Sequence, residues 1–153
     1  MRTFDERLTP PWWLWAIGEV LVVLLALSFY VALGPAAGGA ILLVFGGAVA
    51  WLLVTAGASV TVEGDTLTAG PARIPVSALG PVEILDADGA RAVRGPESDP
   101  AGYHLIRGWV PAGVRANVVD PQDPTPYWFV ATRRPTALAA AIEGARTPSR
   151  PEG

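Results

Sequence analysis

Residues 12–57 read WWLWAIGEVLVVLLALSFYVALGPAAGGAILLVFGGAVAWLLVTAG and contain one acidic and no basic side chain. Gly34 and Pro35 interrupt this apolar stretch near its middle, where a helix would break. The pattern predicts two apolar helices, at about 12–33 and 38–56. About 20 residues are enough to cross a hydrocarbon core of ~30 Å. We therefore expect an α-helical transmembrane hairpin over residues 12–57.

The energetics of insertion favour the bilayer in spite of Glu19. Each Leu, Ile, Val or Phe contributes about −0.3 to −0.6 kcal/mol at mid-bilayer, and the many such residues of the first span outweigh the about +3 kcal/mol of one acid. A secretory signal peptide is the alternative for this span. Its apolar stretch is longer than such peptides need, however, and a second apolar segment follows at once.

Composition restricts both the size of the remaining domain and its chemistry. The chain has 153 residues, of which 51% are hydrophobic, so it has room for one hairpin and one small domain. Cysteine is absent, which excludes disulfides, thiolate catalysis and sulfur-ligated metals. A net charge of −3 argues against a nucleic-acid partner. We expect no cofactor.

The positions of the arginines predict the orientation in the membrane. All basic residues other than the one histidine are arginine, and they all lie outside the two spans. A hairpin returns the chain to its starting side, and positive residues favour the cytoplasm. We expect a multi-pass plasma-membrane protein with both termini cytoplasmic, in which residues 1–11 form a cytoplasmic segment.

Two groups of residues in the hairpin suggest specific roles. Trp12, Trp13 and Trp15 begin the first span, where indole rings typically anchor a helix at the membrane interface. Small residues with spacings that place them on one face of the second helix would allow close helix packing. They are Gly39, Gly46, Ala50 and Gly57. This face is expected to pack on the first helix, or alternatively to form the seam of a homodimer.

Glu19 is the one charged residue inside the predicted spans. At 1.5 Å rise per residue it would lie ~10 Å below the interface. An intramembrane carboxylate suggests function, such as transport or proton handling. The alternative is a tolerated residue that is protonated, bonds a neighbouring helix or lies nearer the surface.

The remaining residues, 58–146, predict β-structure closed by one helix. Short alternating or β-branched runs separated by turn residues predict seven strands, and an Ala-rich run after Pro135 predicts a helix. The strands are expected at 60–62, 66–68, 73–76, 82–86, 104–110, 114–119 and 127–132, and the helix at 136–145. Residues 147–153, rich in Pro, Ser and Arg, are expected to be a disordered tail.

Seven short strands followed by a C-terminal helix resemble the bacterial pleckstrin-homology-like (PH-like) domain, a partly open barrel. The opening Ala72-Arg73-Ile74-Pro75-Val76 and Ser77-Ala78-Leu79-Gly80 match that pattern as well. Such domains often follow a pair of membrane helices. The resemblance covers about 58–146 and implies a scaffold rather than an activity.

A second resemblance rests on short motifs spread over nearly the whole chain. They are Glu6-Arg7-Leu8, Pro11-Trp12-Trp13, Asp99-Pro100 before Tyr103, Arg107-Gly108-Trp109-Val110, Asp120-Pro121, Asp123-Pro124-Thr125-Pro126-Tyr127-Trp128 and Arg133-Arg134-Pro135. Together they resemble an actinobacterial membrane-protein family known as domain of unknown function 3093. The family's pattern has Pro more often than Gly at position 108. The resemblance implies no catalytic residue.

A candidate interaction or ligand site follows from the expected strand at 104–110. Extended from Tyr103, its alternation would place Tyr103, Arg107 and Trp109 on one face, where Arg107 could stack on the aromatic rings or hold a carboxylate or phosphate. Asp123, Tyr127 and Arg133 complete the candidate set. The alternative is a structural Arg107 that pairs with Asp99, Asp120 or Asp123.

No catalytic or metal-binding set is predicted. His104 is the only histidine, so a zinc site would need carboxylates for its other ligands. Ser98, His104 and Asp99 have no accompanying nucleophile turn or oxyanion loop.

Three functions follow from these patterns. The first is a membrane-tethered interaction or scaffolding module at the inner leaflet, which would not be an enzyme. The alternatives are lipid or small-ligand binding by the β-domain, and a membrane enzyme or transporter that uses Arg107 or Glu19.

Overall fold

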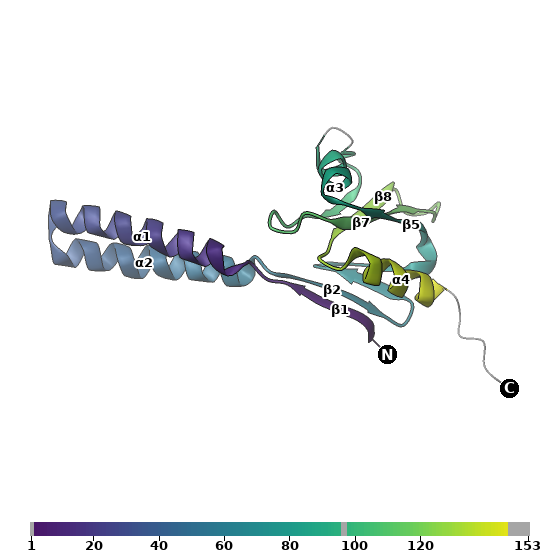
Figure 1. Ribbon diagram of the computed structural model, residues 1–153, viewed down its shortest axis with the longest axis horizontal. Helices are drawn as coiled ribbons and strands as arrows, with labels where there is room; N and C mark the ends of the chain where they lie inside the picture. Colours follow the sequence, from purple (N-terminus) through teal and green to yellow (C-terminus); the bar gives the residue numbers. More distant parts are fainter. Residues whose placement is uncertain (1, 96–97, 147–153) are drawn as a thin grey trace. The chain divides into compact units, whose positions relative to one another are not determined.

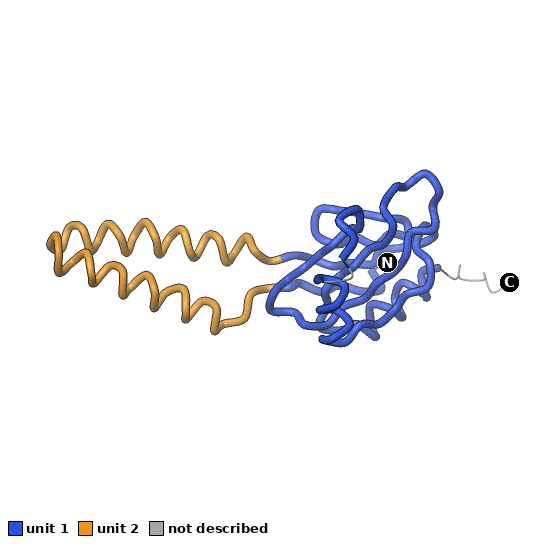
Figure 2. The backbone as a smooth tube through the Cα atoms, turned by 90° about the horizontal axis from the view of Figure 1, so that it is seen from above, with its two compact units in different colours: residues 1–8, 58–153 blue, residues 9–57 orange. Residues whose placement is uncertain are grey.

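The computed structural model describes residues 2–95 and 98–146 of the chain, and the predicted disordered tail at 147–153 lies outside them. The chain divides into two compact units, coloured separately in Figure 2. One consists of residues 9–57. The other joins residues 1–8 to 58–153, so the helical unit is inserted between two segments of the β-rich unit. A helical pair and a β-rich region with a C-terminal helix were both expected, and both are confirmed.

The helical unit contains α1 (Trp12–Leu33) and α2 (Pro35–Thr55), which lie side by side (Figure 1). Gly34 reverses the chain direction with a φ of 94°, a conformation that side chains other than glycine rarely adopt. The second helix begins at Pro35 rather than Gly38 because proline suits the first helical position. Both helices are long and apolar enough to cross a membrane, by length and composition.

Sheet A is antiparallel, in the order β1-β2-β3-β4. Its strands are β1 (Arg2–Leu8), β2 (Ala58–Glu63), β3 (Thr66–Ala69) and β4 (Ala72–Pro75). Along these strands every second side chain points into the core, which is the alternation expected of a sheet with one buried face. The buried members of this sheet include Phe4, Leu8, Val60, Val62, Leu67 and Ile74.

Strand β1 is the strand that the sequence analysis missed. It pairs antiparallel with β2, with Phe4 opposite Val62 and Leu8 opposite Ala58. Its inward positions are 4, 6 and 8, and position 6 is a glutamate. A charged residue at a buried position hid the alternation.

Sheet B has the order β5-β7-β8-β6. It is reached through a short 3-10 turn, η1 (Val76–Ala78), and contains β5 (Leu79–Leu85), β7 (Gly113–Val118), β8 (Tyr127–Ala131) and β6 (Tyr103–Leu105). Strand β6 is parallel to β8, whereas the other pairs are antiparallel. A short helix, α3 (Ala87–Arg94), follows β5 and was not predicted. Asp86 caps it by accepting a hydrogen bond from the Gly89 backbone N–H at 2.9 Å.

The predicted seven-stranded, partly open barrel is wrong. The described residues form eight strands in two separate sheets that are not closed into a barrel. Two features explain the difference. The η1 turn separates β4 from β5. The predicted strand at 104–110 ends at Leu105, and the chain then turns, because the Val110 N–H donates to the Arg107 carbonyl at 2.8 Å.

Helix α4 (Pro135–Arg146) contacts strands of both sheets, β1 and β2 from sheet A and β5 and β7 from sheet B. Leu138, Ala139 and Ile142 are its buried residues, at the i, i+1 and i+4 spacing of one helix face. The helix thus completes a core that the two sheets share.

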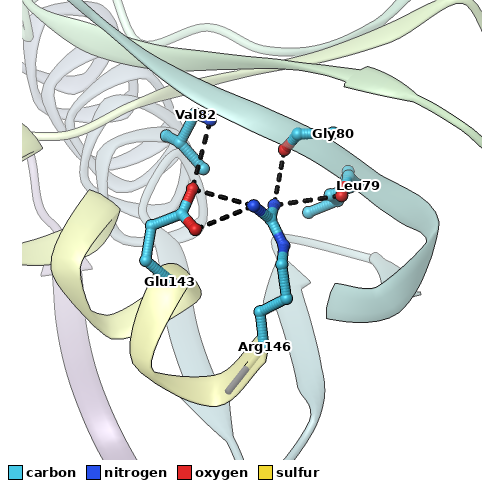
Figure 3. A network of polar contacts seen from close by, with 5 residues as sticks. All are labelled: Leu79, Gly80, Val82, Glu143 and Arg146. Atoms are coloured by element: carbon cyan, nitrogen blue, oxygen red, sulfur yellow. Dashed lines mark hydrogen bonds and ion pairs between the residues drawn. The ribbon is translucent and has the colours of Figure 1, made fainter.

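The end of α4 binds an irregular part of β5, as Figure 3 shows. The register between β5 and β7 shifts between Leu79 and Val82, which leaves backbone groups without a strand partner. The Arg146 guanidinium donates to the carbonyls of Leu79 and Gly80 at 3.0 and 2.5 Å, and also to Glu143. Glu143 in turn accepts from the Val82 N–H at 3.4 Å. This pair satisfies the irregular backbone of β5.

Candidate functional site

Two of the short motifs, from opposite ends of the chain, meet in the β-rich unit. The Glu6 carboxylate accepts a hydrogen bond from the Thr132 hydroxyl and one from the Arg133 backbone N–H at 3.1 Å. Glu6 is 8% exposed and Thr132 is fully buried. Buried polar groups are costly unless they are hydrogen-bonded, and here both are. We call Glu6, Thr132, Arg133 and Arg134 the terminal clamp.

Arg134, the residue directly before α4, completes the clamp. Its backbone N–H donates to the Thr132 hydroxyl at 3.0 Å, and its guanidinium donates to the Asp5 carbonyl at 2.6 Å. The guanidinium carbon also lies 4.8 Å from the centroid of the Phe4 ring, a cation–π distance. The clamp therefore fixes β1 to the start of α4. It has no feature of a metal site, since no group of three or more His, Cys, Asp or Glu in the described part of the chain could hold an ion.

The Tyr103 side chain connects the two sheets. Its hydroxyl donates to the Ala69 carbonyl of β3 at 2.5 Å, and its ring lies 4.2 Å from that of Trp128, centroid to centroid. Burial raises the pKa of Tyr103 above its ordinary value of 10.0, against smaller opposing effects of an Ala72 backbone hydrogen bond and the charge of Arg107. The phenol stays protonated and acts as a donor.

Tyr127 is buried and holds a polar network on the other side of β8. Its hydroxyl accepts from the Asp99 backbone N–H at 3.0 Å and lies 3.0 Å from Nε2 of His104. Burial lowers the pKa of His104 below 6.5, which favours the neutral ring, and the tautomer of that ring decides which of the two groups donates. Gly102 allows this approach, because a Cβ there would lie 2.8 Å from the Tyr127 ring. Arg115 covers that ring at 4.4 Å.

Arg107 and Trp109 do not lie on the extended strand that was expected, since β6 ends at Leu105. Arg107 donates to the Ile106 carbonyl at 2.7 Å, and no ion pair joins it to an aspartate in the described residues. The alternative considered for Arg107, a pairing with Asp99, Asp120 or Asp123, is therefore not seen in the described residues. Trp109 packs against the core.

The remaining candidates, Asp123 and Arg133, do not belong to the network of Tyr127, His104 and Asp99. Asp123 accepts a hydrogen bond from the Thr125 backbone N–H at 2.9 Å, in the connection between β7 and β8. Hydrogen bonds from the Thr125 hydroxyl and backbone lower the pKa of Asp123 below its ordinary value. Arg133 belongs to the terminal clamp. The six candidates thus do not form one cluster. Tyr103 and Tyr127 lie on neighbouring strands, the charge of Arg107 acts on Tyr103, Trp109 packs against the core, and Asp123 and Arg133 lie elsewhere.

A polar groove lies on the outer face of sheet A, which sequence analysis did not single out. A groove of about 370 Å³ is lined by Arg2, Thr61, Glu63, Thr66, Thr68 and Arg73. Arg2 is paired with Asp5 at 3.1 Å and Glu63 at 3.6 Å. Arg73 is exposed, and cross-strand register places it beside Thr68, which is next to Thr61. The alternation of each strand could have indicated this polar face.

Comparison with known proteins identifies the family to which this chain is related. A family model described as "Protein of unknown function (DUF3093)" matches residues 3–142. The chain belongs to the DUF3093 family. No curated protein and no solved structure matches it. The DUF3093 match covers α1, α2, the terminal clamp and nearly all of both sheets, and it ends within α4, before Glu143 and Arg146.

The remaining predicted residues of this DUF3093 protein lie in or next to the helical unit. Trp12, Trp13 and Trp15 begin α1, and Trp12 is the most exposed of them. On α2, a Cβ at Gly46 would lie 3.8 Å from Val22 and 3.9 Å from the Glu19 carboxylate, so position 46 faces α1.

The other predicted packing positions of α2 differ in their surroundings. Gly39 has no atom within 4 Å of a built Cβ. The tightest contact of this kind is at the neighbouring Gly38, where a Cβ would lie 2.7 Å from that of Tyr30. Ala50 is half-buried on α2, and Gly57 follows the helix rather than lying in it.

Proposed function

We propose that this protein is a membrane-anchored interaction module. Its two helices span the plasma membrane as a hairpin, both termini are cytoplasmic, and the β-rich unit docks a protein partner at the inner leaflet. The proposal includes no catalytic step. It is supported by the surface of the helices, by the pairing of β1 with β2 and by the polar face of sheet A.

The surface of the helical unit supports a lipid environment. Large apolar side chains such as Val31, Leu43 and Trp51 are at least 70% exposed, and only Val22, Ala26 and Gly38 are buried. A core helix of a water-soluble protein would bury such side chains, because exposed apolar area is unfavourable in water. Lipid removes that cost.

The pairing of β1 with β2 is the observation that carries the proposal. Leu8 lies opposite Ala58, so the two segments that flank the hairpin are neighbouring strands of one sheet. The proposal places both segments on the same side of the membrane. A chain that leaves and returns to one side crosses an even number of times, which is consistent with two spanning helices. Cytoplasmic placement is supported by the arginines outside the spans.

The short connections support a domain held near the headgroups. Three residues, 9–11, separate β1 from α1, and two residues, 56–57, separate α2 from β2. At ~3.5 Å per residue each connection spans roughly 10 Å or less. The domain is thus tethered at two points and not by one flexible linker.

The distribution of polar groups supports docking over catalysis. The buried polar side chains Glu6 and Thr132 hydrogen-bond each other, and the buried Tyr127 binds His104 and Asp99. These groups hold the fold. The outer face of sheet A instead presents charges of both signs and hydroxyls, which suit a polar protein surface.

Single-cysteine labelling tests the topology directly, because the natural chain has no cysteine. Thr3→Cys, Ala36→Cys and Gln122→Cys are treated with a membrane-impermeant maleimide in intact cells. We expect labelling at position 36 alone, and at positions 3 and 122 only after permeabilisation. Labelling of 3 or 122 in intact cells would contradict the orientation, and opposite accessibility of 3 and 122 would contradict the hairpin.

Docking is tested with a photo-crosslinking amino acid at Thr68 in the groove, with Arg91 on α3 as the matched exposed control. We expect one stoichiometric adduct from position 68 that is absent from position 91 and abolished by Arg73→Glu. No adduct at 68, or equal adducts at both positions, would contradict docking at this face.

A second candidate is a small anionic ligand in the same groove. It is favoured by the exposed Arg73 beside the Thr68 and Thr61 hydroxyls, since a guanidinium and hydroxyls suit a carboxylate or phosphate. Native mass spectrometry of the full chain in detergent would show a retained small molecule that is lost in Arg73→Gln. Retention that Arg73→Gln leaves unchanged would remove this candidate.

A further inference from the structure

We propose that Glu19 is a docking site, within the bilayer, for a basic side chain on a transmembrane helix of a partner protein. The inference rests on the membrane-spanning hairpin proposed above. It adds to it a second contact, made in the lipid rather than by the β-rich unit.

The carboxylate is placed well inside the span. Glu19 is the eighth residue of α1, which corresponds to ~10 Å along the helix from Trp12 at 1.5 Å per residue. It is half-buried against α2, with one carboxylate oxygen 3.9 Å from the position of a Cβ on Gly46. Because Gly46 has no side chain, nothing on α2 at this position covers the acid.

No group in the described part of the chain satisfies this carboxylate. No hydrogen bond or ion pair to Glu19 is formed there, although Ser28 and Thr55 in the same helices hydrogen-bond carbonyls of their own helix. Residues 12–57 contain no basic side chain that could rotate toward it. Ionisable groups inside membranes are costly and commonly pair with one another or with backbone. A partner on another molecule would supply what the hairpin lacks.

The charges of the hairpin indicate which kind of molecule pairs with Glu19. A second copy of the chain would bring another acid and no base to the same depth, because Glu19 is the only charged residue of the hairpin. A helix with an Arg or Lys at the matching depth supplies the opposite charge and several donors. Gly47, where a built Cβ meets no atom within 4 Å, adds a position on α2 at which another backbone can approach closely. The occupant is thus a basic partner helix.

The test uses synthetic transmembrane peptides as the probe. The full-length protein is reconstituted into vesicles with fluorescent Leu-rich helices that carry a single Lys eight residues from one end or the other, or no Lys. Association is measured by energy transfer. We expect the protein to bind a Lys peptide about tenfold more tightly than the all-Leu peptide, and expect this preference to disappear in Glu19→Gln.

A relocated acid serves as the matched control. The double variant Glu19→Gln/Val20→Glu keeps one carboxylate at nearly the same depth but moves it to an exposed position. We expect it to lose the Lys preference. Full preference in the double variant would show that any acid at this depth suffices, and would overturn the site.

Other outcomes also decide between the possible occupants. Self-association that depends on Glu19 without any peptide would overturn the inference in favour of a second copy. Equal binding of Lys and Leu peptides by the wild-type protein, with the cysteine labelling pattern intact, would overturn the inference while the hairpin stands. Failure of that labelling pattern would instead remove the proposed function itself.

Discussion

The Thr132 hydroxyl donates a hydrogen bond to the Glu6 carboxylate across 126 residues of sequence. Because β1 lies before the hairpin and Thr132 lies just before α4, this bond joins the two ends of the β-rich unit. Both side chains are buried, so neither can exchange its partner for water. The unit therefore depends on a segment that is separated from the rest of it by two helices.

Removing the Glu6 carboxylate should destabilise the β-rich unit. Glu6→Ala leaves the Thr132 hydroxyl and the Arg133 N–H without their acceptor, and we expect a loss of about 2–3 kcal/mol in the free energy of unfolding. Hydrogen exchange of residues 2–8, measured by mass spectrometry in detergent, should accelerate. Asp5→Ala, an exposed change on the same strand, should have little effect; equal effects of the two variants would contradict the clamp.

Removing Arg146 should release the end of α4 from β5. The guanidinium binds two backbone carbonyls that the irregular strand leaves unpaired, so Arg146→Ala should cost about 1–3 kcal/mol, measured as a lower thermal midpoint of the full chain. Arg91→Ala is the control, because Arg91 makes an exposed pair with Asp88 on α3. A midpoint unchanged by Arg146→Ala would show that the α4 contact adds no stability.

Sequence patterns predicted those parts of the fold that depend on local periodicity. The helical pair followed from its long apolar stretch, and β2 and β3 followed from alternating runs separated by turn residues. The division into two sheets did not follow, because it depends on which strands pair across long loops. Strand β1 was missed because its central inward residue is Glu6, whose partner Thr132 no local window contains.

The candidate site was predicted less well, for a related reason. Strand alternation was extended through Arg107 and Trp109, but Gly108 and Pro111 allow the chain to turn there, and β6 stops at Leu105. Aromatic residues such as Tyr103 and Tyr127 suggested a ligand, whereas their hydroxyls satisfy groups inside the protein. The groove on sheet A has no unusual residue, only polar residues on one face of four strands.

His104 should make stability depend on pH below neutrality. Burial lowers its pKa in the folded chain below the ordinary 6.5, so the unfolded chain binds its proton more readily. The stabilisation is present above about pH 6.5 and is lost as the pH falls toward the folded pKa. Since His104 is the only histidine, its imidazole NMR signal in the full chain reports the titration directly.

We expect a midpoint below 6.5 for that signal, and a thermal midpoint that falls less on acidification in His104→Gln than in the wild type. An imidazole signal that titrates at or above 6.5 would contradict the network of His104, Tyr127 and Asp99.

Neighbouring glycines of α2 should respond differently to one added methyl group. A Cβ at Gly38 would lie 2.7 Å from the Tyr30 Cβ and 3.0 Å from the Ala26 carbonyl oxygen, so Gly38→Ala should force the helices apart and cost about 1–3 kcal/mol. Gly39→Ala meets no atom and should be neutral or stabilising. Thermal unfolding followed by circular dichroism in detergent compares them. The reverse order would contradict the packing of α1 on α2.

The pairing of β1 with β2 also sets an order for biosynthesis. The ribosome completes β1 first, but its partner strand emerges only after both apolar helices have been made. Until then the Phe4 and Leu8 side chains have no core to enter, and residues 2–8 remain unpaired. In the proposed topology, an insertion error that carried these residues across the lipid would leave β2 as an unpaired sheet edge, open to aggregation.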